Sequence, residues 1–260
     1  CITNAKDYNA KGARYNSVYV QGVGLGTITD CLTSLKYNVF EEKKCSMRQM
    51  LSALKADFKG FEKLQNDLVY HTPKYGNDDD YADQNAVDVF EIFFDAVNGK
   101  KSPLNATYRI NMLPTTCHIY FGSVTGASTD GRNAGKPLSE GISPVQGTDK
   151  YGPTAVLKSA AKFDHTKTGG TLLNQKFTPD FFETEENIKK LTALIRGYFR
   201  MDTHHIQFNV IDKQTLLDAQ RNPQDYQNLI VRVAGYSDYF NDLGEDLQNE
   251  IINRTEHLNC

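Results

Sequence analysis

A glycine near the C-terminus, Gly235, has the most distinctive chemical potential in this sequence. It follows the alternating run Val231-Arg232-Val233, which predicts a short buried strand that turns at Ala234-Gly235. A glycine in such a turn ordinarily serves a left-handed backbone. It can also hold an unpaired electron, because a Cα without a side chain becomes planar and the electron delocalises into both adjacent amides. Arg232 and Tyr236 flank the turn and are predicted to brace it by hydrogen bonding and packing.

A second set of polar side chains, Thr115, Thr116 and His118, lies within one short segment. Alternation and β-branching from Asn111 to Phe121 predict a buried strand, at whose end these side chains would face the interior. They are candidates for contact with a small substrate, with Thr115 the preferred one. Structural hydrogen bonding is an equally good interpretation of all three.

The cysteines and histidines form no recognisable metal site. The number of cysteines is odd, and no two have the close spacing of a zinc or redox pair, so free thiols are predicted rather than a disulfide framework. His204 and His205 are adjacent, and in a strand they point to opposite faces. We therefore predict that no metal is bound. The cysteines are Cys1, Cys31, Cys45, Cys117 and Cys260.

Gly22, Gly24 and Gly26 raise the alternative of a nucleotide-binding domain. They follow a predicted strand and precede a predicted helix, as in a dinucleotide-binding turn. The third glycine of that pattern is expected one residue later, where Thr27 stands, so the pattern is out of register. An ordinary strand-to-helix turn is the favoured interpretation. A hydrolytic triad built on His118 is disfavoured, because no Gly-x-Ser-x-Gly turn is present.

Strands that alternate with helices must position these residues, which predicts an α/β architecture. The loop from Gly122 to Pro153 is long, and we expect it to be ordered and packed rather than disordered. The expected strands are 17–21, 111–121, 155–157 and 204–210, and the expected helices are 29–42, 46–70, 80 or 83 to 98, 185–200, 213–219 and 241–257.

Composition excludes several classes of function. A hydrophobic content of 39% supports a packed core, while a net charge of −3 and a pI near 6.1 argue against a nucleic-acid partner. No apolar run reaches the length of a membrane span, and the first residues lack the features of a signal peptide. We therefore expect no membrane association and a cytoplasmic location.

Segments along the whole chain resemble the glycyl radical enzymes of the pyruvate formate-lyase-like superfamily, in the family's order. The segment Met112 to His118 is most similar to the branch that dehydrates trans-4-hydroxy-L-proline. One position departs from the family pattern: a small residue is favoured three positions after the radical glycine, and here it is Asp238. The segments are 12–16, 21–24, 74–79, 125–127, 130–132, 138–146, 170–177, 205–209, Arg232 to Tyr236 and 254–257.

The resemblance implies part of a ten-stranded α/β barrel. Residues 1–135 would form part of the second half-barrel with peripheral helices, and residues 136–260 the C-terminal glycyl radical domain. The family's Gly-Cys-Val-Glu-like loop, which carries the catalytic cysteine, does not occur here. We therefore expect that cysteine on the remainder of the same enzyme, with this chain as its C-terminal portion.

The resemblance also implies cofactors and partners. A radical-SAM activating enzyme with a 4Fe-4S cluster would install the radical on Gly235, and this chain itself would bind no cofactor. The other expected partners are the cysteine-bearing remainder, a small-molecule substrate and a second copy in a homodimer. An anaerobic organism or niche is implied, because oxygen destroys such radicals.

The expected reaction removes water from trans-4-hydroxy-L-proline and yields a pyrroline-5-carboxylate. Dehydration of glycerol or propanediol, and carbon–nitrogen cleavage of the choline type, remain open because those branches share most of the quoted segments. A different class also remains: a non-catalytic spare-part protein that donates its glycine loop to a damaged partner.

Overall fold

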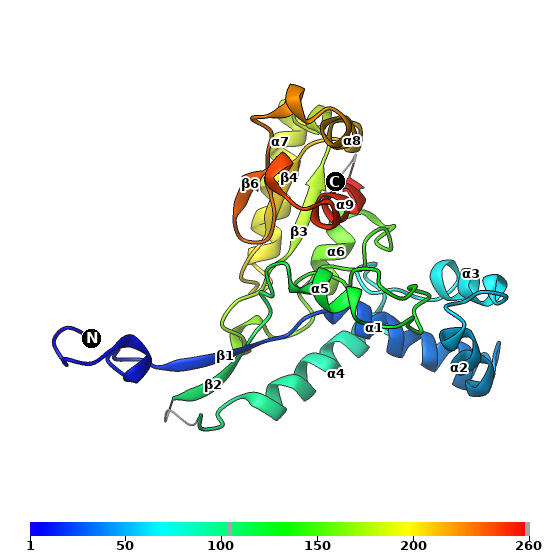
Figure 1. The fold of residues 1–260 in the computed structure, drawn as a ribbon, viewed down its shortest axis with the longest axis horizontal. Helices are drawn as coiled ribbons and strands as arrows, with labels where there is room; N and C mark the ends of the chain where they lie inside the picture. Colours follow the sequence, from blue (N-terminus) through cyan, green and yellow to red (C-terminus); the bar gives the residue numbers. More distant parts are fainter. Residues whose placement is uncertain (103–105, 258–260) are drawn as a thin grey trace.

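The computed structural model describes residues 1–102 and 106–257, drawn in Figure 1. The strands are β1 (Ser17–Gln21), β2 (Thr107–Asn111), β3 (Asn174–Phe177), β4 (Gln207–Val210), β5 (Ile230–Arg232), β6 (Ser237–Tyr239) and β7 (Glu256–His257). The α-helices are α1 (Leu25–Ser34), α2 (Met47–Lys55), α3 (Glu62–Tyr70), α4 (Asp80–Val97), α5 (Cys117–Ser123), α6 (Gly152–Ala160), α7 (Glu185–Phe199), α8 (Lys213–Arg221) and α9 (Glu245–Asn253). A π-helix, η2 (Leu35–Glu41), continues α1, and 3-10 turns occupy η1 (Tyr8–Ala10), η3 (His165–Lys167), η4 (Pro179–Phe182), η5 (Pro223–Tyr226) and η6 (Phe240–Asp242).

Parallel strands form two separate sheets, β1-β2 and β4-β3-β7, which a single bridge joins into one wall. β1 pairs with β2, and β3 pairs in parallel with both β4 and β7. Past the end of β2, Met112 pairs with Thr171, just before β3, so the wall runs from β1 through β2 and β3 to β4. Helices connect these strands, as parallel pairing requires. The predicted α/β class is confirmed.

The first strand-to-helix unit follows the prediction in outline and departs from it in the helix start. β1 ends at Gln21 as expected, and α1 begins at Leu25 rather than at Thr29. Gly24 caps the helix with a φ of +81°, a conformation that glycine adopts without strain. Thr29, where the helix was expected to begin, is therefore buried inside α1, as is Asp30.

The amphipathic stretch 46–70 is two helices rather than one. Ser46 starts α2 as expected, with a complete capping box in which the Ser46 and Gln49 side chains each accept from the other residue's backbone N–H. After Lys55 the chain turns, because Asp57 and Phe58 have left-handed φ values of 49° and 61°. Phe58 is thereby buried, and α3 begins at Glu62.

Three other expectations are wrong. The predicted strand 111–121 overlaps the observed strand β2 only at Asn111, and the residues from Cys117 to Ser123 form the helix α5. The predicted strand 155–157 lies inside α6, and the predicted helix 241–257 is confined to α9, with β7 following it. In the first two cases a short apolar pattern fits a buried helix as well as a strand.

The long loop between α5 and α6 is packed against the body of the protein, as expected. The Tyr75 hydroxyl donates to the backbone carbonyl of Ile142 at 2.9 Å, and Asn77 donates to the carbonyl of Thr148 at 2.9 Å. The Lys74 ammonium donates to the carbonyl of Asp130 at 3.1 Å. The segment before α4 thus holds the loop in place.

Three apolar clusters hold these elements together. The first lies between α4, α6 and the wall strands, and it draws residues from both sides of position 135, for example Phe90 and Val156. The second surrounds the C-terminal strands and includes Val231, Val233 and Ile251. The third joins α2 to α3. The domain division at residue 135 stays a prediction.

Among the described residues, the structure contains no helix with the length and apolar character needed to cross a bilayer.

Candidate functional site

Gly235 lies at the tip of a two-stranded hairpin. β5 and β6 pair antiparallel, and the N–H of Val233 donates to the carbonyl of Tyr236 at 2.8 Å, so the turn predicted at Ala234-Gly235 is confirmed. Gly235 has a φ of +80°, and, apart from its two chain neighbours, no described residue has an atom within 4 Å of a Cβ built on it. Its Cα is therefore exposed at the surface of this chain while the strands below it are fixed.

Gln207 on β4 holds the glycine from one side. Its side-chain Oε1 accepts a hydrogen bond from the N–H of Gly235 at 2.9 Å and from the Arg232 Nε at 3.2 Å. Its Nε2 donates to the carbonyl of Val233 at 3.3 Å. Gln207 belongs to one of the segments used for the family resemblance, but no role follows from its position in the sequence, because it lies 28 residues from Gly235.

Arg232 holds the glycine from the other side. Its Nη2 donates to the carbonyl of Gly235 at 3.1 Å, and its Nη1 donates to the Ser237 Oγ across the hairpin at 3.2 Å. Tyr236 contributes through its main chain, while its side chain is 40% exposed. The structure thus brings Arg232 and Tyr236 to the glycine as expected, and their role there stays a prediction.

The stem of the hairpin is anchored by two further side chains that sequence reasoning missed. Asn209 exchanges two hydrogen bonds of 2.7 Å with the main chain of Arg232. Arg254, just after α9, donates to the carbonyls of Arg232 at 3.2 Å and of Val233 at 3.0 Å. Asn209 belongs to β4 and Arg254 follows the end of α9, whose Ile251 and Ile252 share an apolar cluster with the hairpin.

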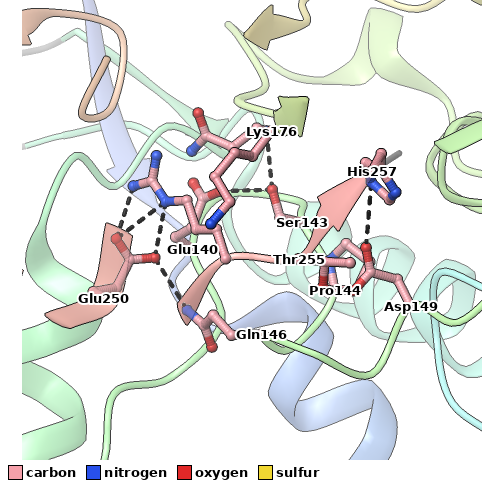
Figure 2. A pocket seen from close by; sticks show the side chains of 11 residues that line it. Glu140, Ser143, Pro144, Gln146, Asp149, Lys176, Glu250, Thr255 and His257 are labelled. Carbon is pink, nitrogen blue, oxygen red and sulfur yellow. Dashed lines mark hydrogen bonds and ion pairs between the residues drawn. The ribbon is translucent and has the colours of Figure 1, made fainter. Parts of the chain in front are cut away.

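A buried group of charged side chains lies beneath this anchor (Figure 2). Glu250 accepts from the Arg254 Nη2 at 2.8 Å and from its Nε at 3.2 Å. Burial alone would raise the pKa of Glu250, but the positive charge of Arg254 and the neighbouring His118 outweigh burial and hold that pKa well below its usual range. Glu140 has no such close partner, and burial raises its pKa. Glu250 is therefore the ionised carboxylate that balances Arg254.

The far side of the same pocket holds a second charged group. Burial lowers the pKa of Lys176 to about 8, and its ammonium donates to the carbonyl of Ile252 at 3.2 Å. The His257 Nε2 lies 3.7 Å from Asp149, and burial together with Lys176 lowers the His257 pKa to about 4. Burial raises the pKa of Asp149 to about 6. His257 is thus neutral at pH 7.

The three polar residues of the second predicted set are not brought together as expected. They do not lie in a strand: Thr115 is exposed with a φ of 52°, and Thr116 occupies the N-cap position of α5 without a capping side-chain hydrogen bond. His118 is fully buried, and its Nε2 lies 3.7 Å from the Glu250 Oε1. Only His118 reaches the charged group beneath the hairpin. Substrate contact by any of the three stays a prediction.

The turn with three glycines is covered by the protein's own chain. A Cβ on Gly26 would lie 2.7 Å from the backbone oxygen of Ser143, and one on Gly22 would lie 2.7 Å from the Met112 Sδ. These glycines therefore allow close packing of protein against protein. This contact disfavours a nucleotide phosphate at the same place.

Within the part of the chain that the structure describes, Cys1, Cys31, Cys45 and Cys117 are unpaired, and Cys260 lies outside it. Over the same residues, no three His, Cys, Asp or Glu side chains gather where they could hold a metal ion.

Two family models match the chain. The pyruvate formate lyase-like model matches residues 1–122, and the glycine radical model matches residues 138–241. Gly235 and its flanking strands β5 and β6 lie within the second match.

Individual relatives match over almost all of the chain. A trans-4-hydroxy-L-proline dehydratase of Clostridioides difficile is 58% identical over 98% of this chain and 32% of its own length. The crystal structure of hydroxyproline dehydratase from the same organism, with trans-4-hydroxy-L-proline bound, superposes with a TM-score of 0.96 over 99% of this chain and 33% of its own. A glycerol-bound, B12-independent glycerol dehydratase from Clostridium butyricum superposes with a TM-score of 0.95 at 44% identity, again over 99% of this chain and 33% of its own. The chain therefore spans about a third of the length of the relatives it matches.

Proposed function

Because the chain belongs to the pyruvate formate lyase-like family of glycyl radical proteins, we propose that it is the C-terminal part of a dehydratase that stores a radical on Gly235. The observation that carries the proposal is the hairpin tip: Gly235 has its amide N–H and its carbonyl both held by side chains, while its Cα is uncovered within the described residues. A held main chain keeps the two amides that share the electron in place, and an uncovered Cα can give up its hydrogen.

The proposed cycle conserves hydrogen atoms and electrons. A radical-SAM activating enzyme removes one hydrogen atom from the Gly235 Cα. The glycyl radical then takes a hydrogen atom from a cysteine thiol on the remainder of the enzyme, and the resulting thiyl takes one from the substrate. Acid/base residues on the remainder of the enzyme give a proton to the substrate hydroxyl, which leaves as water, and take one proton from the substrate in return. The thiol then returns its hydrogen atom to the product radical, and the thiyl that results regains a hydrogen atom from the Gly235 Cα, which restores the glycyl radical. The sum is substrate to dehydrated product plus water, with no external oxidant.

We propose trans-4-hydroxy-L-proline as the substrate and a pyrroline-5-carboxylate as the product. The support is the relative named for that substrate, which is 58% identical to this chain, against 44% for the glycerol dehydratase. Glycerol is the second candidate. The activated full-length protein is incubated anaerobically with each compound, and the products are analysed. If glycerol loses water and trans-4-hydroxy-L-proline does not, the first choice is refuted.

Electron paramagnetic resonance tests the radical itself. After anaerobic activation of the full-length protein, we expect a doublet signal that is absent from Gly235→Ala. Alanine at a φ of +80° costs about 1 kcal/mol, and the open space at the hairpin tip accepts its methyl group. The loss of signal should therefore not come from unfolding.

Gly60→Ala is the matched control. Gly60 is also exposed and has the same φ of +80°, and, apart from its two chain neighbours, no described residue has an atom within 4 Å of a Cβ built on it. The two variants should lose the same stability, and only Gly235→Ala should lose the signal. Wild-type protein without a signal, or a signal that survives in Gly235→Ala, would refute the proposal.

The partners follow from the same proposal. They are the cysteine-bearing remainder of the enzyme, a radical-SAM activating enzyme and a second copy in a homodimer, in an anaerobic organism or niche. The length of the relatives supports the first of these, since this chain spans about a third of each.

A further inference from the structure

The buried guanidinium of Arg254 binds the stem of the β5–β6 hairpin, residues 230–239, which carries Gly235 and is called the radical hairpin below. Its side chain is 7% exposed, and it donates to two successive carbonyls, those of Arg232 and Val233, at 3.2 and 3.0 Å. These carbonyls lead directly into Ala234-Gly235. A planar guanidinium with fixed donor directions can hold two such acceptors at once, which the point charge of a lysine cannot do.

Glu250 fixes the direction of that guanidinium. It lies one turn earlier on α9, its side chain is 1% exposed, and it accepts from both Nε and Nη2 of Arg254. Glu250 is itself held by the Gln146 Nε2 at 3.2 Å. The pair therefore links the C-terminal helix and the 124–151 loop to the hairpin stem, and neither partner can turn without breaking a charge-assisted hydrogen bond.

The contacts of Arg254 are complementary to those of the other anchors. Gln207 and the Arg232 side chain hold the glycine's own N–H and carbonyl, whereas Asn209 and Arg254 hold the residues before it. A shift of the stem therefore moves the Gly235 Cα even when the glycine's own hydrogen bonds persist. Hydrogen-atom transfer depends on the position of that carbon, because misplacement by about 1 Å can cost a large factor in rate.

We propose that Arg254, oriented by Glu250, is a positioning residue for the radical hairpin: it holds the hairpin stem against the end of α9 and thereby fixes the position of the Gly235 Cα. The proposal rests on the proposed function for its consequence in catalysis. The contact between Arg254 and the hairpin stem exists in the folded protein before activation.

The test uses the full-length protein with the double substitution Arg254→Met and Glu250→Gln. Removing Arg254 alone would leave a buried carboxylate without its counter-charge, which is strongly destabilising, whereas removing both charges avoids that penalty. Glutamine at position 250 still accepts from Gln146. Arg254→Lys is the second variant: it keeps the ion pair with Glu250 but cannot span both carbonyls.

Arg132→Met is the matched control, because it also removes a buried guanidinium that binds backbone carbonyls. Arg132 donates to the carbonyls of Asn133, Lys136 and Gly126, within the 124–151 loop and away from the hairpin.

The first measurement is hydrogen–deuterium exchange of residues 231–239 without activation. We expect exchange about tenfold faster in the double variant and in Arg254→Lys, as the loss of one charge-assisted hydrogen bond implies, and unchanged exchange there in Arg132→Met. The second is the number of radical spins per chain after activation, which should fall by about tenfold in the same two variants.

The inference would be overturned if residues 231–239 exchanged hydrogen at the wild-type rate in Arg254→Lys and in the double variant. It would also be overturned if Arg132→Met accelerated that exchange as much as these variants do. If these variants behave as wild type while Gly235→Ala still abolishes the signal, the inference fails and the proposed function stands. If wild-type protein gives no radical signal, the proposed function fails, and the exchange measurement still decides whether Arg254 holds the hairpin in position.

Discussion

At the tip of the hairpin, single side chains decide how Gly235 is presented. The glycine N–H and the Arg232 Nε share one acceptor, the Oε1 of Gln207. Gln207 therefore couples the glycine to β4, and through β4 to the barrel wall.

Gln207→Ala tests that coupling. The substitution removes the acceptor for both donors and the donor to Val233, so we expect the free energy of unfolding to fall by about 1–3 kcal/mol. The measurement is urea unfolding of the full-length protein. Gln214→Ala is the control: Gln214 is exposed and bonds only to Asp218 on its own helix, so its effect should stay within about 0.5 kcal/mol. Equal losses in the two variants would contradict the assignment to Gln207.

At the scale of elements, α1 is fastened to the segment before α4 by a buried carboxylate. The Asp30 Oδ1 accepts from the N–H of Tyr75 at 2.8 Å, while Oδ2 has no hydrogen-bond partner among the described residues. Burial raises the pKa of Asp30 to about 7, and Lys74 offsets only part of the effect. The helix is therefore docked best when Asp30 carries a proton.

This docking predicts a pH dependence of stability. Between the pKa of an exposed aspartate, about 4, and about 7, the folded protein keeps a proton on Asp30 that the unfolded chain has released. The Asp30 contribution is thus present below about pH 4 and is lost as the pH rises to about 7.

Asp30→Asn removes the titration while its side-chain oxygen can still accept from Tyr75. We expect the unfolding free energy of the variant, relative to wild type, to increase as the pH rises from 4 to 7 and then to level off. Denaturant unfolding across this range measures it. A constant difference between the two proteins would show that Asp30 is ionised in the folded state at acid pH.

At the scale of the whole molecule, the chain exposes apolar side chains and strand edges of the kind that another part of a protein covers. Figure 1 shows β1 and β2 reaching away from the body as a two-stranded pair. Tyr19 on β1 is 49% exposed, and Ile230 on β5 is 57% exposed. Open parallel strands are rare in isolated domains, because such sheets are usually covered on both faces.

We therefore expect this 260-residue chain to be poorly stable when expressed alone. It should bind a hydrophobic dye and melt without a sharp transition, whereas the full-length protein should melt cooperatively. Calorimetry of both measures the difference. A cooperative transition in the isolated chain would instead favour the alternative of an independently folded spare-part protein.

Local features of the sequence were sufficient to predict the hairpin turn at Gly235, the strand β1, and the helices α7 and α8. In each case, the deciding signal lies within a few neighbouring residues: an alternating run, a capping side chain or a helical apolar spacing. The family resemblance added the fold and the proposal that Gly235 carries the radical.

The tertiary structure alone decided what holds that glycine. Gln207 and Arg254 lie 28 residues before Gly235 and 21 residues after Val233, and only the packing of β4 and α9 against the hairpin brings them there. The same cause explains the failed strand at 111–121. Its pattern suits a strand, but His118 is buried beside Glu250 on α9. Contacts between distant segments carry no local signal, because their free energy is gained only when the segments pack.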